Sequence, residues 1–187
     1  MIKHALASVL SILATATPVQ SQVAIQPLLH KPLVEAIQRA GVSYEVNSKH
    51  CEHGMDGFYY RDENGKYIIG VCQAASYAGG PEKPWTANDF DTLRHEAFHL
   101  VQDCIVDGER NLVLHQFFDG PGGMPGDVGL DKVIEDLGPE RALKIWQSYH
   151  KRGLSPEGIY MEIEAFSVAR FVAPGDIAKL VNKFCRP

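Results

Sequence analysis

The stretch T-L-R-H-E-A-F-H-L-V-Q-D-C, residues 92–104, carries the pattern H-E-x-x-H, in which a glutamate directly follows the first of two histidines. On a helix, residues four apart lie on one face, so His95 and His99 can present their imidazoles to a single ion. Glu96 lies one residue further round, where its carboxylate can hydrogen-bond to a water on that ion. Bound Zn²⁺ lowers the pKa of such a water to about 7, so the pattern favours a zinc site that activates water.

The surrounding sequence predicts a helix for this stretch. Apolar residues recur at helical spacing over residues 89–105, and Thr86 or Asn88 can cap the helix at its start. Upstream, Asn64 and Gly65 separate two runs rich in aromatic and β-branched residues. This order is typical of a β-hairpin, because both turn residues tolerate a positive φ.

The other predicted elements place strands before most of the helices. No internal repeat is visible, and 187 residues is a one-domain length. Strands clustered ahead of helices indicate an α+β fold, with a short antiparallel hairpin packed on the motif helix. The remaining elements expected are a short helix that begins at Pro32 and ends at Gly41, a strand over 41–46, and helices near 131–137, 139–152, 156–172 and 175–184.

The first residues have the order of a secretory signal peptide. A short basic start, M-I-K-H, precedes the apolar stretch A-L-A-S-V-L-S-I-L-A-T-A and a polar end with small residues. Val19 and Ser21 fit cleavage after Ser21, and cleavage after Ala16 is the alternative. We therefore expect residues 1–21 to be removed and residues 22–187 to form one secreted or periplasmic domain.

The cysteines agree with export. They are even in number and lack C-x-x-C spacing, which favours two disulfides over a zinc knuckle. Four cysteines allow three connectivities. Pairing Cys51 with Cys72 and Cys104 with Cys185 is favoured, because the first pair brackets the predicted hairpin.

The net charge and the apolar content of the chain argue against some kinds of binding partner. A formal charge of −5 leaves no basic surplus to neutralise phosphates, which argues against a nucleic-acid partner. Past the predicted signal peptide, no apolar run reaches the roughly eighteen residues that a membrane span needs. We expect a monomer that acts on a peptide or protein substrate.

The hairpin followed by H-E-x-x-H on a helix resembles the zincin metallopeptidases, and the resemblance extends to one later helix. It implies a small α+β domain with bound Zn²⁺. It also implies an antiparallel edge strand just before the motif helix that lines the substrate groove, and residues 66–72 stand in the matching place. The metzincin branch is excluded, because it needs Gly and then His or Asp where this chain has Gln102 and Ile105.

The gluzincin branch of that superfamily takes its third zinc ligand from a glutamate on a later helix. Residues 160–171, Y-M-E-I-E-A-F-S-V-A-R-F, offer Glu162 and Glu164 among apolar neighbours, where a buried carboxylate needs a partner or a metal. In gluzincins the ligand is often followed by one small residue and, two positions later, by another. Ala165 and Ser167 follow Glu164 in this way, so the resemblance implies Glu164 as the ligand, with Glu162 as the alternative.

Two supporting roles stay open at this point. Thermolysin-like enzymes have Asp four residues after the ligand, whereas Val168 stands there in this chain. Asp103 is therefore a candidate for orienting the histidines, and as a ligand it would strain a straight helix. Tyr149, His150 and Tyr160 are candidates for a donor to the oxyanion.

These observations together predict a gluzincin-type zinc peptidase, in which Glu96 takes a proton from the attacking water and passes it to the leaving amine. A zinc hydrolase of a non-peptide amide or ester is an alternative, because the motif fixes the activated water and not the acyl group. A catalytically inactive zincin-fold binding domain and a metal-free, disulfide-held structural protein are the others.

Overall fold

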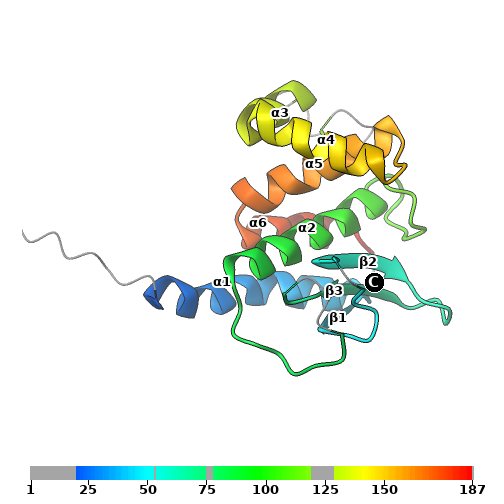
Figure 1. Cartoon of the computed structure of the whole chain (residues 1–187). Helices are drawn as coiled ribbons and strands as arrows, with labels where there is room; N and C mark the ends of the chain where they lie inside the picture. The colour runs from blue at the N-terminus through cyan, green and yellow to red at the C-terminus, as the bar shows by residue number, and fades with distance from the viewer. Residues whose placement is uncertain (1–19, 53, 75–77, 119–128, 187) are drawn as a thin grey trace, which may run out of the picture.

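The computed structural model describes residues 20–52, 54–74, 78–118 and 129–186, and most of the predicted signal peptide lies outside these ranges (Figure 1). The predicted α+β class is confirmed. The described residues form six helices and a three-stranded sheet: α1 Gln20–Arg39, β1 Ser43–Val46, β2 Gly57–Arg61, β3 Tyr67–Val71, α2 Ala87–Cys104, α3 Leu130–Leu137, α4 Pro139–Lys151, α5 Pro156–Phe171 and α6 Pro174–Phe184.

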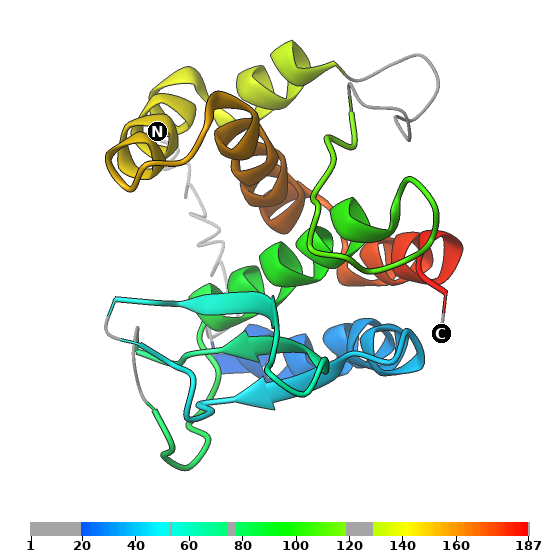
Figure 2. The same cartoon turned by 90° about the vertical axis from the view of Figure 1, so that its right-hand side faces the viewer.

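The motif helix α2 lies in the middle of the molecule. Its capping box begins at Thr86, whose side chain accepts from the backbone N–H of Asp89 while the Asp89 carboxylate accepts from the Thr86 backbone N–H. One side of α2 packs on β2 and β3, and the other side packs on α5 (Figures 1 and 2). Almost the whole helix is therefore buried, which explains why polar side chains on it need specific partners.

The sheet is mixed, with the order β1-β3-β2. The predicted hairpin is present: β2 and β3 are antiparallel, and Gly65 in their turn has a φ of +80°. β1 adds to β3 in the parallel direction, so β3 is the central strand. The expectation that residues 66–72 form an edge strand is therefore wrong, and β2 is the edge strand of the hairpin.

Helix α1 is longer than predicted. Its predicted start at Pro32 is wrong, because the helix begins at Gln20 and includes Pro27 and Pro32. Proline lacks the N–H of a helical hydrogen bond and is common at a first turn, which is why the sequence indicated a start there. The buried face of α1 includes Leu33, Ala36 and Ile37, together with the polar His30.

Two disulfides hold the ends of the central elements, as the preferred connectivity predicted. Cys51–Cys72 joins the segment ahead of β2 to the residue after β3. Cys104–Cys185 joins the last residue of α2 to the residue that follows α6, which fixes the motif helix to the C-terminal part of the chain.

Helix α5 lies between two apolar clusters. Ala165 and Val168 belong to the large core built on α1, α2, α6 and the sheet. Ile159 and Ile163 belong to a smaller core with α3 and α4. The buried side chains in the middle of α5 therefore pack on both clusters, and Glu162 and Phe166 line the cleft beside them. Among the described residues, none of the helices combines the length and the apolarity that crossing a membrane needs.

Candidate metal centre

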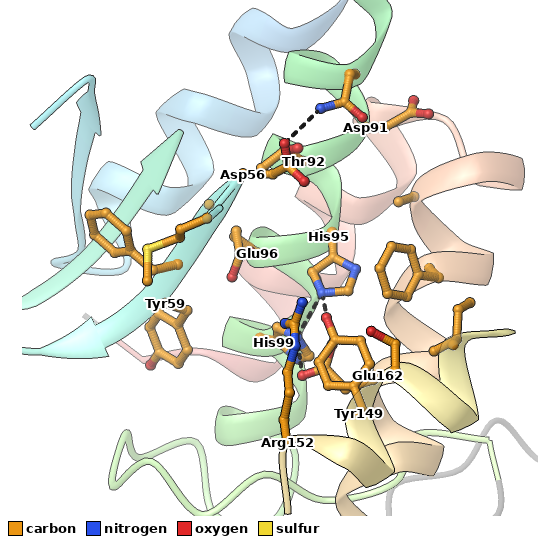
Figure 3. Close-up of a pocket in the computed structure, with 18 of the residues that line it drawn as sticks. Asp56, Tyr59, Asp91, Thr92, His95, Glu96, His99, Tyr149, Arg152 and Glu162 are labelled. Carbon is orange, nitrogen blue, oxygen red and sulfur yellow. Dashed lines mark hydrogen bonds and ion pairs between the residues drawn. The ribbon is translucent and has the colours of Figure 1, made fainter. Parts of the chain in front are cut away.

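Three side chains from two helices converge at one point between α2 and α5 (Figure 3). The Nε2 atoms of His95 and His99 lie 3.0 Å apart. The two carboxylate oxygens of Glu162 lie 3.2 Å from the Nε2 of His95 and 3.5 Å from that of His99. These three residues form a group that could hold a metal ion.

The spacing fits one tetrahedral ion. Ligand bonds of 2.0–2.1 Å at tetrahedral angles separate neighbouring ligand atoms by about 3.3 Å. The two imidazole nitrogens lie 3.0 Å apart, and each lies near that value from one oxygen of Glu162, 3.2 Å from Oε2 for His95 and 3.5 Å from Oε1 for His99. Two imidazole nitrogens that face each other this closely need a proton or a metal ion between them, because two lone pairs repel.

The acidic member of the group is Glu162, and the prediction that named Glu164 is corrected. The two residues lie two positions apart on α5 and therefore point in different directions. Glu162 reaches the histidines, whereas Glu164 is fully buried and turned to another set of partners. The small residues Ala165 and Ser167 are buried on α5, but the carboxylate that joins the histidines comes before them, at Glu162.

The carboxylate of Glu164 holds the residue that orients one of the histidines. It accepts a hydrogen bond from the Nε2 of Gln102 at 2.9 Å, and Gln102 also donates to the backbone carbonyl of Met161 at 3.1 Å. With its amide nitrogen committed to two acceptors, Gln102 presents its carbonyl oxygen to the Nδ1 of His99 at 2.7 Å. That oxygen can only accept, so Nδ1 carries a proton, and Nε2, which is directed at Glu162 and His95, is the nitrogen that can take a metal ion or a second proton.

The same carboxylate anchors the chain that follows α2. The backbone N–H groups of Phe117 and Phe118 donate to Glu164 at 2.9 and 3.1 Å. The sequence does not assign the apolar run at residues 112–118 to a helix or a strand, and the structure shows neither in this segment. A buried carboxylate with three N–H donors satisfies backbone groups that a regular element would otherwise satisfy.

Asp103 does not orient the histidines, as the sequence suggested it could. Its carboxylate accepts from the hydroxyl of Tyr59 at 2.6 Å and from the backbone N–H of Asn111 at 3.0 Å. Asp103 therefore ties β2 and the chain after α2 to the motif helix. The orienting role belongs to Gln102, which sequence reasoning missed, although its position three residues after His99 places it on the same helix face.

Charges in the group favour a cation at its centre. Burial acts to raise the pKa of the Glu162 carboxyl, but the hydrogen bonds from His95 and His99 hold it well below its ordinary value. Burial is the largest single influence on the pKa of His99 and acts to lower it, but the hydrogen bond to Glu162 and the negative charges of Glu162 and Glu96 together raise the pKa to about 9. The carboxylate thus stabilises a positive charge at the imidazoles, and a divalent ion would supply that charge.

Glu96 stands beside the group on the side of β2 (Figure 3). Its side chain is buried in the wall of a cleft of about 1000 Å³, and this burial raises the pKa of its carboxyl. Strand β2 approaches this part of α2 closely because residue 57 is glycine. A Cβ on Gly57 would lie 2.4 Å from the Cγ2 of Thr92 and 3.1 Å from the Cγ of Glu96.

The three residues that the sequence offered as oxyanion donors lie in different places in the structure. Tyr149 lines the cleft and donates a hydrogen bond to Glu162, while burial raises the pKa of its hydroxyl. Tyr160 packs on Trp146 in the smaller core, with ring centroids 5.2 Å apart. His150 lies exposed on α4. Tyr149 is therefore the member of the three that reaches the metal-binding group.

No protein-family model, curated protein or solved structure matches this chain at a significant level.

Proposed function

We propose that this protein is a zinc-dependent peptidase of the gluzincin type, with His95, His99 and Glu162 as ligands. The observation that carries the proposal is the convergence of two imidazoles and one carboxylate beside the free carboxylate of Glu96 in a cleft. Two nitrogen ligands and one oxygen ligand leave a fourth position open, which is the arrangement of catalytic rather than structural zinc.

Zn²⁺ held there would supply an acidified water and would polarise the acyl carbonyl of a substrate. Glu96 has a raised pKa through burial, so it is suited to take the proton of the attacking water and to hand it to the leaving nitrogen. The Tyr149 hydroxyl keeps its proton and lies at the ligand carboxylate, from which it can turn to donate to the developing oxyanion.

The shape of the cleft favours an extended substrate. Strand β2 lines it through Gly57, Phe58 and Tyr59, and within the described residues β2 pairs with β3 alone. The outer edge of β2 can therefore hydrogen-bond to a peptide in the manner of an added strand. The two disulfides indicate an oxidising environment, which agrees with the proposed secreted or periplasmic location.

The test compares metal content and hydrolysis in three purified proteins: the wild type, Glu96→Gln and His95→Ala. The wild type is expected to bind about one zinc ion per chain and to cleave a mixture of unstructured peptides. Glu96→Gln should keep the metal and lose hydrolysis, because the ligands remain while the proton acceptor is neutral. His95→Ala should lose both, because a ligand is missing.

Each other outcome has a specific reading. Undiminished hydrolysis by Glu96→Gln would remove Glu96 from the mechanism. Stoichiometric metal with cleavage of esters or simple amides, and of no peptide, would establish the non-peptide hydrolase. Stoichiometric metal without turnover of either class would establish a binding domain, and wild-type protein without metal after incubation with zinc would refute the site itself.

A further inference from the structure

One wall of the cleft carries a stripe of positive charge. Arg141 and Lys144 lie on α4, and Arg152 is the residue at its C-terminal end. These positions are three and eight residues apart, so they lie along one helix face, which faces the cleft. Arg170 near the end of α5 lines the same cleft. Arg141 and Lys144 also line an adjoining hollow of about 660 Å³, together with the acidic Glu140.

These four cations have no acidic partner among the described residues. Elsewhere on the surface, lysines with an acidic neighbour pair with it, as Lys132 does with Asp136 and Lys179 with Asp176. The four cleft cations make none of the ion pairs found in the described part of the chain. Glu162, which lines the same cleft, is bound to the two histidines.

Arg152 is held next to the metal-binding group. Its guanidinium lies 5.1 Å from the centroid of the Tyr149 ring, and the Tyr149 hydroxyl bonds to Glu162. Stacking on an aromatic face leaves the five N–H donors of the guanidinium at its edges, where a carboxylate can accept two in parallel. Arg152 therefore presents an unused fork at a side chain that touches the metal-binding group.

The opposite end of the cleft has the other sign of charge. Figure 3 shows Asp56 and Asp91 at one end, Arg152 at the other and His95, His99 and Glu162 between them. Asp91 is already paired with Arg94, and Asp56 accepts from the amide of Asn88. The cations of the basic end make no ion pair among the described residues, so a bound molecule could supply their anion.

We propose that the α4 wall of the cleft is a subsite for a carboxylate of the substrate, with Arg152 and Lys144 as its principal contacts and Arg141 and Arg170 around them. This inference rests on the proposed peptidase function and specifies its substrate class: peptides that carry an acidic side chain or a free C-terminal carboxylate on this side of the scissile bond. The carboxylate gains charge-assisted hydrogen bonds, while a neutral residue at this position leaves the cations to water.

The experiment measures binding and cleavage separately. Binding is measured by fluorescence anisotropy with the zinc-incubated Glu96→Gln protein and three fluorescein-labelled hexapeptides. The first is Asp-Asp-Ala-Ala-Asp-Asp with an amidated C-terminus, the second replaces every Asp with Asn, and the third is the Asn peptide with a free C-terminus. Asp and Asn have nearly the same shape, so the comparison isolates the charge. Cleavage of the same peptides is measured with the wild type.

The Asp peptide is expected to bind about 10-fold tighter than the amidated Asn peptide at low salt, because each charge-assisted hydrogen bond is worth roughly that factor. The double variant Arg152→Gln/Lys144→Gln should reduce the ratio to about 2-fold or less. The matched control is Lys31→Gln/Lys179→Gln, which removes the same net charge from exposed positions outside the cleft lining. It should leave the ratio unchanged.

The third peptide identifies the source of the carboxylate. Tight binding of the free-acid Asn peptide assigns the subsite to a chain terminus, and tight binding of the Asp peptide alone assigns it to side chains. Equal binding of all three peptides, or an equal loss in the control variant, overturns the subsite. Cleavage of all three at equal rates leaves the peptidase intact and the subsite refuted, whereas an Arg152-dependent preference in binding without any cleavage refutes the peptidase alone.

Discussion

The two glutamates of α5 offer a sharp test of the metal centre, because Glu162→Gln and Glu164→Gln make the same chemical change two residues apart. Glu162 is placed to bind the ion, and Glu164 is placed to hold the protein around it. The first substitution should therefore remove metal from a folded protein, and the second should destabilise a protein that still binds metal.

The size of the stability effect follows from the donors that Glu164 receives. Its carboxylate accepts three N–H groups, from Gln102, Phe117 and Phe118, at 2.9–3.1 Å, and the residue is fully buried. A glutamine can accept two of these bonds through its carbonyl oxygen, but it turns an N–H₂ group toward the third donor. The loss of one charge-assisted bond, with one buried donor left unsatisfied, costs about 2–4 kcal/mol.

Glu162→Gln removes no backbone contact and leaves a side chain of the same size at the edge of the cleft. Its unfolding free energy should fall by about 1 kcal/mol, the ordinary cost of a single substitution. Its metal affinity should fall by more than the 10–100-fold that loss of an outer hydrogen bond costs, whereas Glu164→Gln should stay within that range.

Urea denaturation of metal-free protein in chelator gives the two stabilities, and competition with a chromophoric chelator gives the two affinities. Stability is measured without metal because a bound ion would stabilise the folded protein and mix metal affinity into the measured stability. The opposite result, with metal lost from Glu164→Gln and retained by Glu162→Gln, would refute the assignment of the ligands.

Three further predictions concern the surroundings of the site. Gly57→Ala should lower the unfolding free energy by about 1–3 kcal/mol, because its methyl group would lie 2.4 Å from a side-chain carbon of α2. Gly175→Ala is the control, because nothing lies within 4 Å of the added methyl group there. Urea denaturation measures the stability of both variants. Gln102→Leu should weaken zinc binding about 10–100-fold in a chelator competition, because the second histidine of the motif loses the acceptor that orients it; unchanged affinity would contradict the orienting role. Replacing Cys104 and Cys185 with serine should lower the unfolding free energy by about 4–5 kcal/mol, and removing the other disulfide should lower it by about 3 kcal/mol. The difference is expected because the loops that the two disulfides close span 81 and 21 residues. A larger loss in urea denaturation from the shorter loop would contradict the chain-entropy account.

The parts of this structure that the sequence predicts are those that depend on local patterns. The capped helix around His95 and His99, the hairpin at Asn64 and Gly65, and the helices that Pro139 and Pro156 open each have a nearby start or turn signal. The disulfide pairing follows from the hairpin, because one pair brackets it. Residues 112–118 have no such signal, since their backbone groups are satisfied in part by Glu164, which lies far along the chain.

Local sequence reasoning cannot decide which of the two glutamates meets the histidines, and the reason lies in the packing of α5. A helix with one buried face shows which of two acidic residues faces the protein, but α5 lies between two apolar clusters and shows no polar face there. Both Glu162 and Glu164 have apolar neighbours, so both satisfy the requirement that a buried carboxylate needs a partner. The rotation of α5 about its axis, set by the packing of both clusters, decides which of them meets the histidines.

That arrangement also makes the site depend on the chain beyond the motif. Glu164 joins Gln102, which orients His99, to the backbone of residues 117–118, and the same segment supplies Leu112 and Leu114 to the wall of the cleft. A displacement of this segment would therefore reach the imidazole through only two side chains. One buried carboxylate thus connects the residue that orients His99 to the segment that forms part of the cleft wall.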